Sequence, residues 1–272
     1  MTNIKNILVL SDLDNTLLTT DKGIPEYNIQ MIKKFQEMGG NFTVATGRSI
    51  ESVSNVLKKI ELSTPAIVYN GGIIYDFKNR MYIYKKTLPE SAKEALRLIR
   101  ENFPDIGIEI MCDNNRLYMI RENAYTAKHV VDEGLSYVNT DVSGIKNNWI
   151  RVLFSERNSR LVELQEFCNT LPYDDIEFIM TGTVYFEMVP KGVSKGFGLG
   201  KLCEALNIDI KDTVAIGDYY NDIEILTTAG LSVCVDNAPQ DIKNICHAVV
   251  PKCTDGGVGH LLAQIIKSCS TQ

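Results

Sequence analysis

The sequence predicts an α/β protein with a mainly parallel, doubly wound sheet that is interrupted by an inserted α+β domain. Near both ends of the chain, short apolar runs alternate with segments of helical periodicity, which is typical of a parallel sheet with right-handed crossovers. Between these regions, a helix followed by two strands is expected twice. We therefore expect residues 1–83 and 188–272 to form one discontinuous core and residues 84–187 to form the inserted domain.

The composition is that of a globular protein with one large or two smaller domains. The 272 residues are 44% hydrophobic and 23% charged, and the net charge of −6 argues against a nucleic-acid-binding surface. No run approaches the ~18 apolar residues of a membrane span, and the first apolar run leads into two acids, unlike a signal peptide. The seven cysteines show no CxxC spacing, which favours free thiols. We expect a cytoplasmic protein without membrane or nucleic-acid partners, and the oligomeric state stays open.

The core elements before the insertion are predicted from apolar runs and from residues that start or stop helices. Pro25 opens one helix and Gly39 ends it, and Ser49 is a suitable N-cap for the next. The segment Asn70-Gly71-Gly72 favours a tight turn between strands. The expected elements are strands at 7–10, 41–45, 66–69, 73–75 and 81–86, and helices at about 25–38 and 50–60.

The remaining elements follow from the same reasoning. In the insertion, an amphipathic helix is expected over 89–103. It is followed by strands at 106–112 and 116–121, a helix at 124–133, a strand at 149–154, a helix at 159–171, and strands at 176–180 and 184–189. The core pattern then returns with helices at 195–206, 223–229, 242–246 and 258–267, and strands at 213–216, 231–235 and 248–250.

Two acids directly follow the first predicted strand. Asp12 and Asp14 should project to the same side, because side chains on a strand alternate. Neighbouring carboxylates repel each other and are costly to bury unpaired, whereas a hard cation such as Mg²⁺ accepts oxygen ligands. The plain alternative is a pair of surface acids in a turn. A calcium loop does not fit, because its glycine is absent and Gly23 stands where its closing glutamate belongs.

Three predicted strands end in polar residues, and the carboxyl ends of such strands lie at one edge of a sheet. The three groups are Asp12 with Asp14, Thr46 with Arg48, and Asp218 with Asn221 and Asp222. Carboxylate and amide oxygens favour magnesium over zinc.

Other groups near these strand ends suit phosphate. Thr46 and the Gly47 N–H precede a helix and can bind phosphate oxygens, and Lys195 can supply a countercharge. Each residue also has a plain alternative: Thr46 as a neighbour of a helix cap, Lys195 as a solvated lysine, and Asp222 as a favourable charge at a helix start.

Four short motifs occur in order at these positions. They are Asp12-Leu13-Asp14-Asn15-Thr16, Thr46-Gly47-Arg48, Lys195-Gly196, and Gly217-Asp218-Tyr219-Tyr220-Asn221-Asp222. Together they resemble the haloacid dehalogenase superfamily of phosphatases, and within it the Cof-type branch with an α/β cap inserted between the second and third motifs. The resemblance covers nearly the whole chain and implies a Rossmann-like core with a cap that sets substrate specificity.

The resemblance implies a Mg²⁺-dependent phosphatase of small phosphorylated metabolites, such as sugar phosphates or phosphorylated cofactors. Asp12 would be the nucleophile that forms an aspartyl-phosphate, and Asp14 the general acid and base. The ion would be held by Asp12, the Asp14 backbone carbonyl and Asp218. Asn221 and Asp222 would be ligands through water or would orient the other ligands.

The resemblance also implies that Thr46, Gly47 and Lys195 hold the transferred phosphoryl oxygens. Arg48 and Asn70 either contact the leaving group or make a surface ion pair and a turn. Two other functions stay open. One is a phosphomutase that uses the same motifs, and the other is a non-catalytic, phosphorylatable or anion-binding module, for which the large insertion has no explanation.

Overall fold

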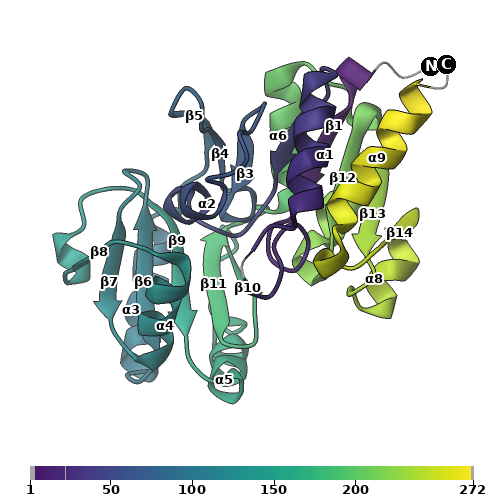
Figure 1. Ribbon diagram of the computed structural model, residues 1–272. Coiled ribbons are helices and arrows are strands. Elements are labelled where there is room, and N and C mark those ends of the chain that lie inside the picture. The colour runs from purple at the N-terminus through teal and green to yellow at the C-terminus, as the bar shows by residue number, and fades with distance from the viewer. Residues whose placement is uncertain (1–3, 22, 271–272) are drawn as a thin grey trace. The chain divides into compact units, whose positions relative to one another are not determined.

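A computed structural model of the protein describes residues 4–21 and 23–270. In this described part the chain forms two compact units (Figure 1). The first unit extends to Arg48, resumes over Val56–Tyr84 and continues again from Ser194. The second unit consists of Ser49–Asn55 and Lys85–Val193. A short segment that precedes the third core strand in the sequence is therefore part of the second unit.

Within the described residues, the central sheet of the first unit has five parallel strands in the order β14-β13-β12-β1-β2. The strands are β1 (Leu8–Ser11), β2 (Asn41–Val44), β12 (Thr213–Gly217), β13 (Leu231–Val235) and β14 (Ala248–Val250). Every residue of β1 and β12 is buried, as expected for strands with helices on both faces. The predicted α/β fold with a mainly parallel sheet is confirmed.

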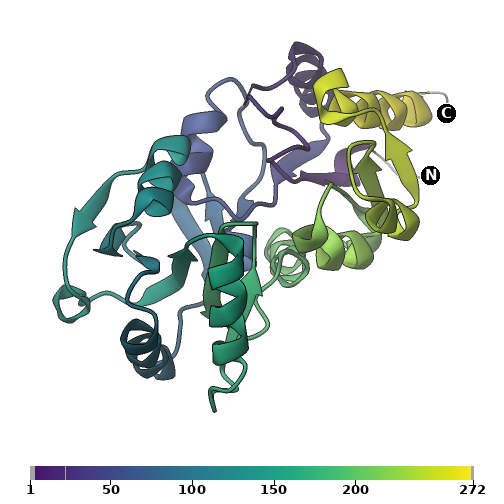
Figure 2. The same cartoon turned by 90° about the horizontal axis from the view of Figure 1, so that it is seen from below.

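Helices cover both faces of this sheet. Leu8 and Leu10 pack in one apolar cluster with residues of three helices. These helices are α6 (Lys195–Leu206), α7 (Ile223–Thr228) and α8 (Gln240–Ile245). Two further helices, α1 (Glu26–Glu37) and α9 (Gly257–Ser270), lie side by side in Figure 1 and again in the turned view of Figure 2. In the described chain, no helix combines the length and the apolar character that crossing a bilayer requires.

The third core strand differs from the expectation. β3 (Ala66–Val68) pairs antiparallel with β4 (Ile73–Asp76), and β5 (Met81–Lys85) completes this small sheet. Its link to the central sheet is a parallel bridge between Ala45 and Ile67. Tyr69 and Asn70 both have positive φ angles, so the chain reverses directly after β3. The preceding helix, α2 (Ile50–Val56), is shorter than expected.

The second unit is built on a mixed sheet with the strand order β10-β11-β9-β6-β7-β8. Its strands are β6 (Gly107–Cys112), β7 (Leu117–Arg121), β8 (Tyr137–Asn139), β9 (Trp149–Ser155), β10 (Ile176–Met180) and β11 (Tyr185–Pro190). Its main helices are α3 (Ser91–Asn102), α4 (Ala124–Glu133) and α5 (Asn158–Cys168). Alternate residues of β6, β9 and β11 pack with α3 and α5 in one apolar cluster. The opposite side of these strands therefore faces away from both helices.

Candidate active site

The ends of β1 and β12 form the centre of the candidate site. Parallel pairing sets Ser11 opposite Ile216, and the Asp12 N–H donates to the Ile216 carbonyl over 2.9 Å. Asp12 and Asp218 therefore leave neighbouring strands at the same edge of the sheet. Each is only 7% exposed. Two acids that lie far apart in the sequence are thus buried together.

Lys195 joins this pair of strand ends to the following turn. Its Nζ donates to Asp12 Oδ1 and to Asp222 Oδ1, in each case over 2.6 Å, and its side chain is fully buried. The residue begins α6, whose N-cap Ser194 accepts a hydrogen bond from the Phe197 N–H over 3.0 Å. Lys195 is therefore a buried, ion-paired residue and not a solvated lysine.

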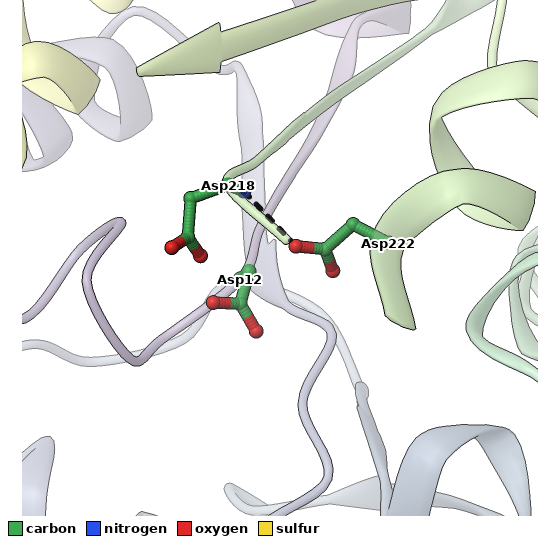
Figure 3. A group of neighbouring side chains, drawn as sticks. All are labelled: Asp12, Asp218 and Asp222. Atoms are coloured by element: carbon green, nitrogen blue, oxygen red, sulfur yellow. Dashed lines mark hydrogen bonds between the residues drawn. The ribbon is translucent and has the colours of Figure 1, made fainter. Parts of the chain in front are cut away.

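Asp222 also accepts hydrogen bonds from the backbone of the turn after β12. Its Oδ2 accepts hydrogen bonds from the backbone N–H groups of Asp218, over 3.0 Å, and Tyr219, over 3.3 Å. Figure 3 shows the first of these bonds. A Cβ at Gly217 would lie 2.5 Å from the same oxygen, so only glycine fits there. Asp222 therefore fixes the path of the turn with one oxygen and holds Lys195 with the other.

The three carboxylates make an acidic cluster whose oxygens lie close enough together to bind one cation. Oxygens of Asp12, Asp218 and Asp222 all lie within 4.8 Å of one another (Figure 3). With the single charge of Lys195, the group carries a net charge of −2 when fully ionised. Burial and the neighbouring carboxylates raise the pKa of Asp12 well above its usual value and that of Asp218 to about 7. This excess buried charge and the all-oxygen donor set fit a hard divalent cation.

The pKa of Lys195 is raised as well. Burial alone would lower it, but the charges of Asp12 and Asp222 favour the protonated amine. Lys195 therefore stays a cation within the site.

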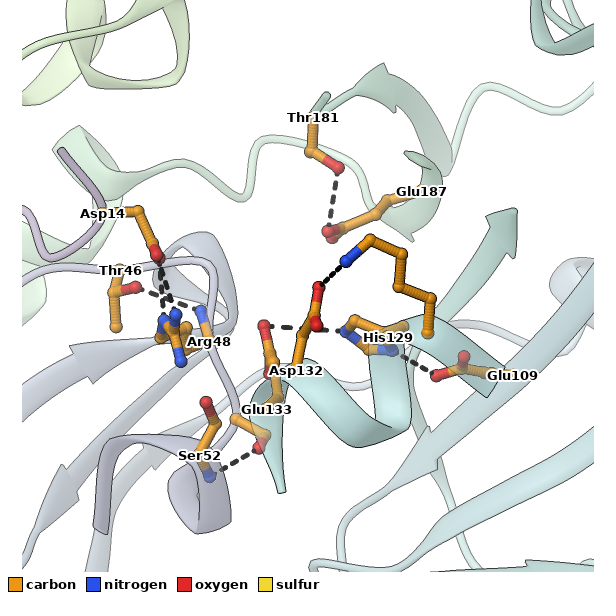
Figure 4. Close-up of polar contacts among 12 residues, drawn as sticks. Asp14, Thr46, Arg48, Ser52, Glu109, His129, Asp132, Glu133, Thr181 and Glu187 are labelled. Carbon is orange, nitrogen blue, oxygen red and sulfur yellow. Dashed lines mark hydrogen bonds and ion pairs between the residues drawn. The ribbon is translucent and has the colours of Figure 1, made fainter. Parts of the chain in front are cut away.

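Asp14 is not one of these three acids and instead forms an ion pair with Arg48. Its two carboxylate oxygens accept from Nε and Nη2 of Arg48, each over 2.7 Å (Figure 4). Arg48 is buried, whereas the Asp14 side chain is 41% exposed. The ion pair is therefore buried on the arginine side, unlike the surface pair that was one of the two expectations for Arg48. The bidentate contact fixes the direction of the Asp14 carboxylate.

The loops after β2 and β3 meet at Thr46. Thr46 Oγ1 accepts from the Arg48 N–H over 3.1 Å (Figure 4), and the Thr46 carbonyl accepts from the Asn70 N–H over 3.0 Å. A Cβ at Gly47 would lie 3.0 Å from the Asn70 amide group, so these two residues are neighbours. Asn70 is 6% exposed. Within the described residues its Oδ1 has no hydrogen-bond partner. This oxygen can therefore accept a hydrogen bond from a bound molecule.

Two features of the site were not predicted from the sequence. The Thr16 hydroxyl donates to Asp218 Oδ1 over 3.1 Å, so the last residue of the first motif orients an acid of the fourth. The sequence signal for this role of Thr16 was its place in the first motif. The second feature is that Arg48 binds Asp14. Asn221 is half-buried in the same turn as Asp218 and Asp222.

Comparison with known proteins gives the class to which this fold and site belong. The family described as haloacid dehalogenase-like hydrolases matches residues 9–262. The chain therefore belongs to this family and is an enzyme of the hydrolase class. The resemblance inferred from the four motifs is confirmed.

Individual relatives match over nearly the whole chain. The phosphoglycolate phosphatase of Methanopyrus kandleri is 27% identical over 96% of this chain and 97% of its own length. The 5-amino-6-(5-phospho-D-ribitylamino)uracil phosphatase YitU of Bacillus subtilis is 24% identical over 96% and 97%, respectively. The crystal structure of TM0651 from Thermotoga maritima superposes with a TM-score of 0.82 at 28% identity, and the match covers 95% of this chain and 97% of that protein.

Proposed function

We propose that the protein is a Mg²⁺-dependent phosphatase that hydrolyses small phosphorylated metabolites through an aspartyl-phosphate on Asp12. The observation that carries the proposal is the convergence of Asp12, Asp218, Asp222 and Lys195 at one sheet edge. Relatives that match nearly the whole chain are named as phosphatases of phosphoglycolate and of 5-amino-6-(5-phospho-D-ribitylamino)uracil, which supports small phosphate esters as substrates. The core, 1–83 with 188–272, would carry the chemistry, and 84–187 would act as the cap.

The residues present suit the ion and its ligands. Asp12, Asp218 and the Asp14 backbone carbonyl would hold Mg²⁺, with Asn221 and Asp222 acting through water or as orienting groups. When bound, the ion offsets the repulsion between a carboxylate nucleophile and a phosphate dianion. Lys195 is already fixed on Asp12 by a 2.6 Å hydrogen bond, so it orients the nucleophile and adds positive charge for the phosphoryl oxygens.

The side chains account for both steps of hydrolysis. An Asp12 oxygen forms a bond to phosphorus while the bond from phosphorus to the leaving alcohol breaks, and Asp14 gives that alcohol a proton. In the second step Asp14 takes a proton from water. The water oxygen bonds to phosphorus, the bond to Asp12 breaks, and inorganic phosphate leaves. Arg48 positions Asp14 through its bidentate contact.

The phosphate-binding role falls to the loops beside these acids. Thr46 and the Gly47 N–H would contact phosphoryl oxygens together with Lys195. Asn70 lies against Gly47 with a buried oxygen that has no protein partner in the described chain. It would accept a hydrogen bond from the substrate.

Phosphate release tests the proposal. The protein should hydrolyse p-nitrophenyl phosphate with Mg²⁺, lose activity in EDTA, and regain it on addition of Mg²⁺. Asp12→Asn keeps the shape of the side chain but removes the nucleophile, so turnover should fall to background. Substantial turnover by this variant, or restoration by Zn²⁺ alone, would contradict the assignment.

The phosphomutase alternative needs its own measurement. With glucose 6-phosphate and Mg²⁺, a phosphatase releases inorganic phosphate, whereas a mutase gives an isomer without release. We expect release. The predicted cytoplasmic location stays a prediction.

A further inference from the structure

The loop after β1 carries Asp14, and its shape is fixed partly by its own hydrogen bonds. The N–H groups of residues 16–18 all donate to the Leu13 carbonyl, over 2.8 to 3.3 Å. Asn15, in the middle of the loop, has a φ angle of 59°, which lies in the left-handed region. The carbonyl of Asn15 accepts a hydrogen bond from a different segment of the chain. The loop is therefore also held from outside.

Asn237 makes this outside contact. It lies in the turn after β13, and its Nδ2 donates to the Asn15 carbonyl over 2.9 Å. Its Oδ1 accepts from the Cys253 N–H, also over 2.9 Å. Cys253 begins the short helical turn that follows β14. Both ends of one amide are thus engaged, one as a donor and one as an acceptor, and they connect the loops after β1, β13 and β14.

Asn28 of α1 makes a second connection between the same loop and the C-terminal part of the chain. Its Nδ2 donates to the Leu17 carbonyl over 3.5 Å, and its Oδ1 accepts from the Gly259 N–H of α9 over 2.7 Å. Asn28 is fully buried, whereas Asn237 is exposed. The segment after β14 therefore holds the loop at two points, and the contact of Asn237 can be changed without altering the core.

The Asn15 carbonyl is close in the chain to two groups of the candidate active site. It shares a planar peptide with the nitrogen of Thr16, and the Thr16 hydroxyl donates to Asp218 Oδ1 over 3.1 Å. Asn15 also directly follows Asp14. A rotation of the Asn15 peptide would therefore shift both neighbours relative to Asp218. Asn237 opposes such a rotation, because it binds the oxygen of that peptide.

We propose that Asn237 is a positioning residue for phosphoryl transfer, which holds Asp14 in place through its hydrogen bond to the Asn15 carbonyl. The inference rests on the proposed function, which gives Asp14 its role and gives Asn237 none. Both of these hydrogen bonds of Asn237 go to backbone groups, and neither goes to the groups that would bind phosphate. Loss of the bond to Asn15 should therefore lower kcat and leave KM nearly unchanged.

Asn237→Asp tests the proposal with a side chain of the same shape. It keeps an oxygen for the Cys253 N–H, but it replaces the NH₂ donor with a carboxylate oxygen, which repels the Asn15 carbonyl at pH 7.5. We expect kcat for p-nitrophenyl phosphate with Mg²⁺ to fall by about tenfold, which corresponds to the loss of one hydrogen bond, while KM stays within about twofold of the wild-type value.

Measurement at lower pH separates positioning from a purely structural role. When the introduced carboxyl is protonated, it regains a donor. The proton resides on the oxygen that faces the Asn15 carbonyl, because the other oxygen accepts from the Cys253 N–H. The ratio of the variant's kcat to that of the wild type should therefore rise by about threefold from pH 7.5 to pH 5. Using the ratio removes the effect of groups that titrate in both proteins, such as Asp218.

Asn244→Asp is the matched control. It makes the same chemical change at an exposed position on α8 of the first unit, where the side-chain oxygen keeps its hydrogen bond from Gln240 Nε2. This variant should have the wild-type kcat at both pH values. A wild-type kcat in Asn237→Asp at pH 7.5, or a loss that is equally large at pH 5, would overturn the proposal.

Hydrogen exchange measures the same contact without catalysis. At pH 7.5 the backbone amides of residues 13–18 should exchange about tenfold faster in Asn237→Asp than in the wild type, because the loop opens more often. An inactive wild type together with faster exchange in the variant would sink the proposed function alone. An active wild type together with an unchanged kcat in the variant would sink this inference alone.

Discussion

The pH dependence of stability tests the charge network around His129. Contacts with Glu109 and Glu133 raise the pKa of His129 from 6.5 to about 9, despite the opposing effect of burial. Because the folded-state pKa lies above the unfolded one, the contribution is complete below pH 6.5 and is lost as the pH rises through about 9. At about 1.4 kcal/mol per pH unit, it amounts to about 3 kcal/mol. The His129 side chain is 7% exposed, so solvent screening reduces this value little.

The protein carries a suitable probe for this measurement. Trp149, its single tryptophan, is a buried residue of β9 in the second unit. Urea unfolding followed by its fluorescence should therefore report on the unit that contains His129. We expect the wild type to lose most of about 3 kcal/mol of unfolding free energy between pH 6.5 and pH 9.

His129→Gln keeps a donor near Glu109 but removes the titrating charge. Its unfolding free energy should be lower than that of the wild type at pH 6.5. It should fall by about 3 kcal/mol less than that of the wild type between pH 6.5 and pH 9, a range in which Asp218 also titrates. His260→Gln, a change at an exposed histidine of α9 in the first unit, should retain the wild-type profile. A flat wild-type profile, or a His129→Gln variant that keeps the slope, would refute the reasoning.

Two further substitutions test the candidate active site. Arg48→Lys keeps the charge but loses the bidentate contact to Asp14. The value of kcat/KM for p-nitrophenyl phosphate should fall by about tenfold, which corresponds to the loss of one charge-assisted hydrogen bond. An unchanged kcat/KM would mean that Arg48 does not position Asp14. Lys195→Met leaves Asp12 and Asp222 buried without their cation, and scanning calorimetry of the EDTA-treated protein should show a loss of about 3–5 kcal/mol in the first unit. A variant as stable as the wild type would argue against the buried ion pairs.

The central geometry was predictable because it depends on strand order and strand ends. Lys195 and Asp12 lie 183 positions apart, yet they form a hydrogen bond. Each was placed at a strand end or a helix start from the sequence, and parallel sheets bring such positions to one edge. What the sequence did not provide was the choice of partner. Whether Arg48 binds Asp14 or a substrate depends on side-chain rotamers, which local sequence does not specify.

The buried charged residues on the sheet of the second unit could not be predicted as a cluster from the sequence, for a different reason. Glu109, Arg151 and Glu187 each interrupt an otherwise apolar strand, and single charges in such strands have many explanations. They become one cluster only because β9 lies between β6 and β11. This strand order does not follow the chain, and short-range patterns carry no information about it. The same limit explains β3, whose antiparallel pairing with β4 depends on the backbone reversal at Tyr69 and Asn70.

The most direct test of the central claim is to trap the covalent intermediate. The protein is mixed with a phosphate ester labelled on its phosphoryl group and quenched in acid within a single turnover, and the label is located by peptide mapping. We expect an acyl phosphate on the peptide that contains Asp12, and no label in Asp12→Asn. Phosphate release without any labelled peptide, or a label on a different residue, would contradict the account.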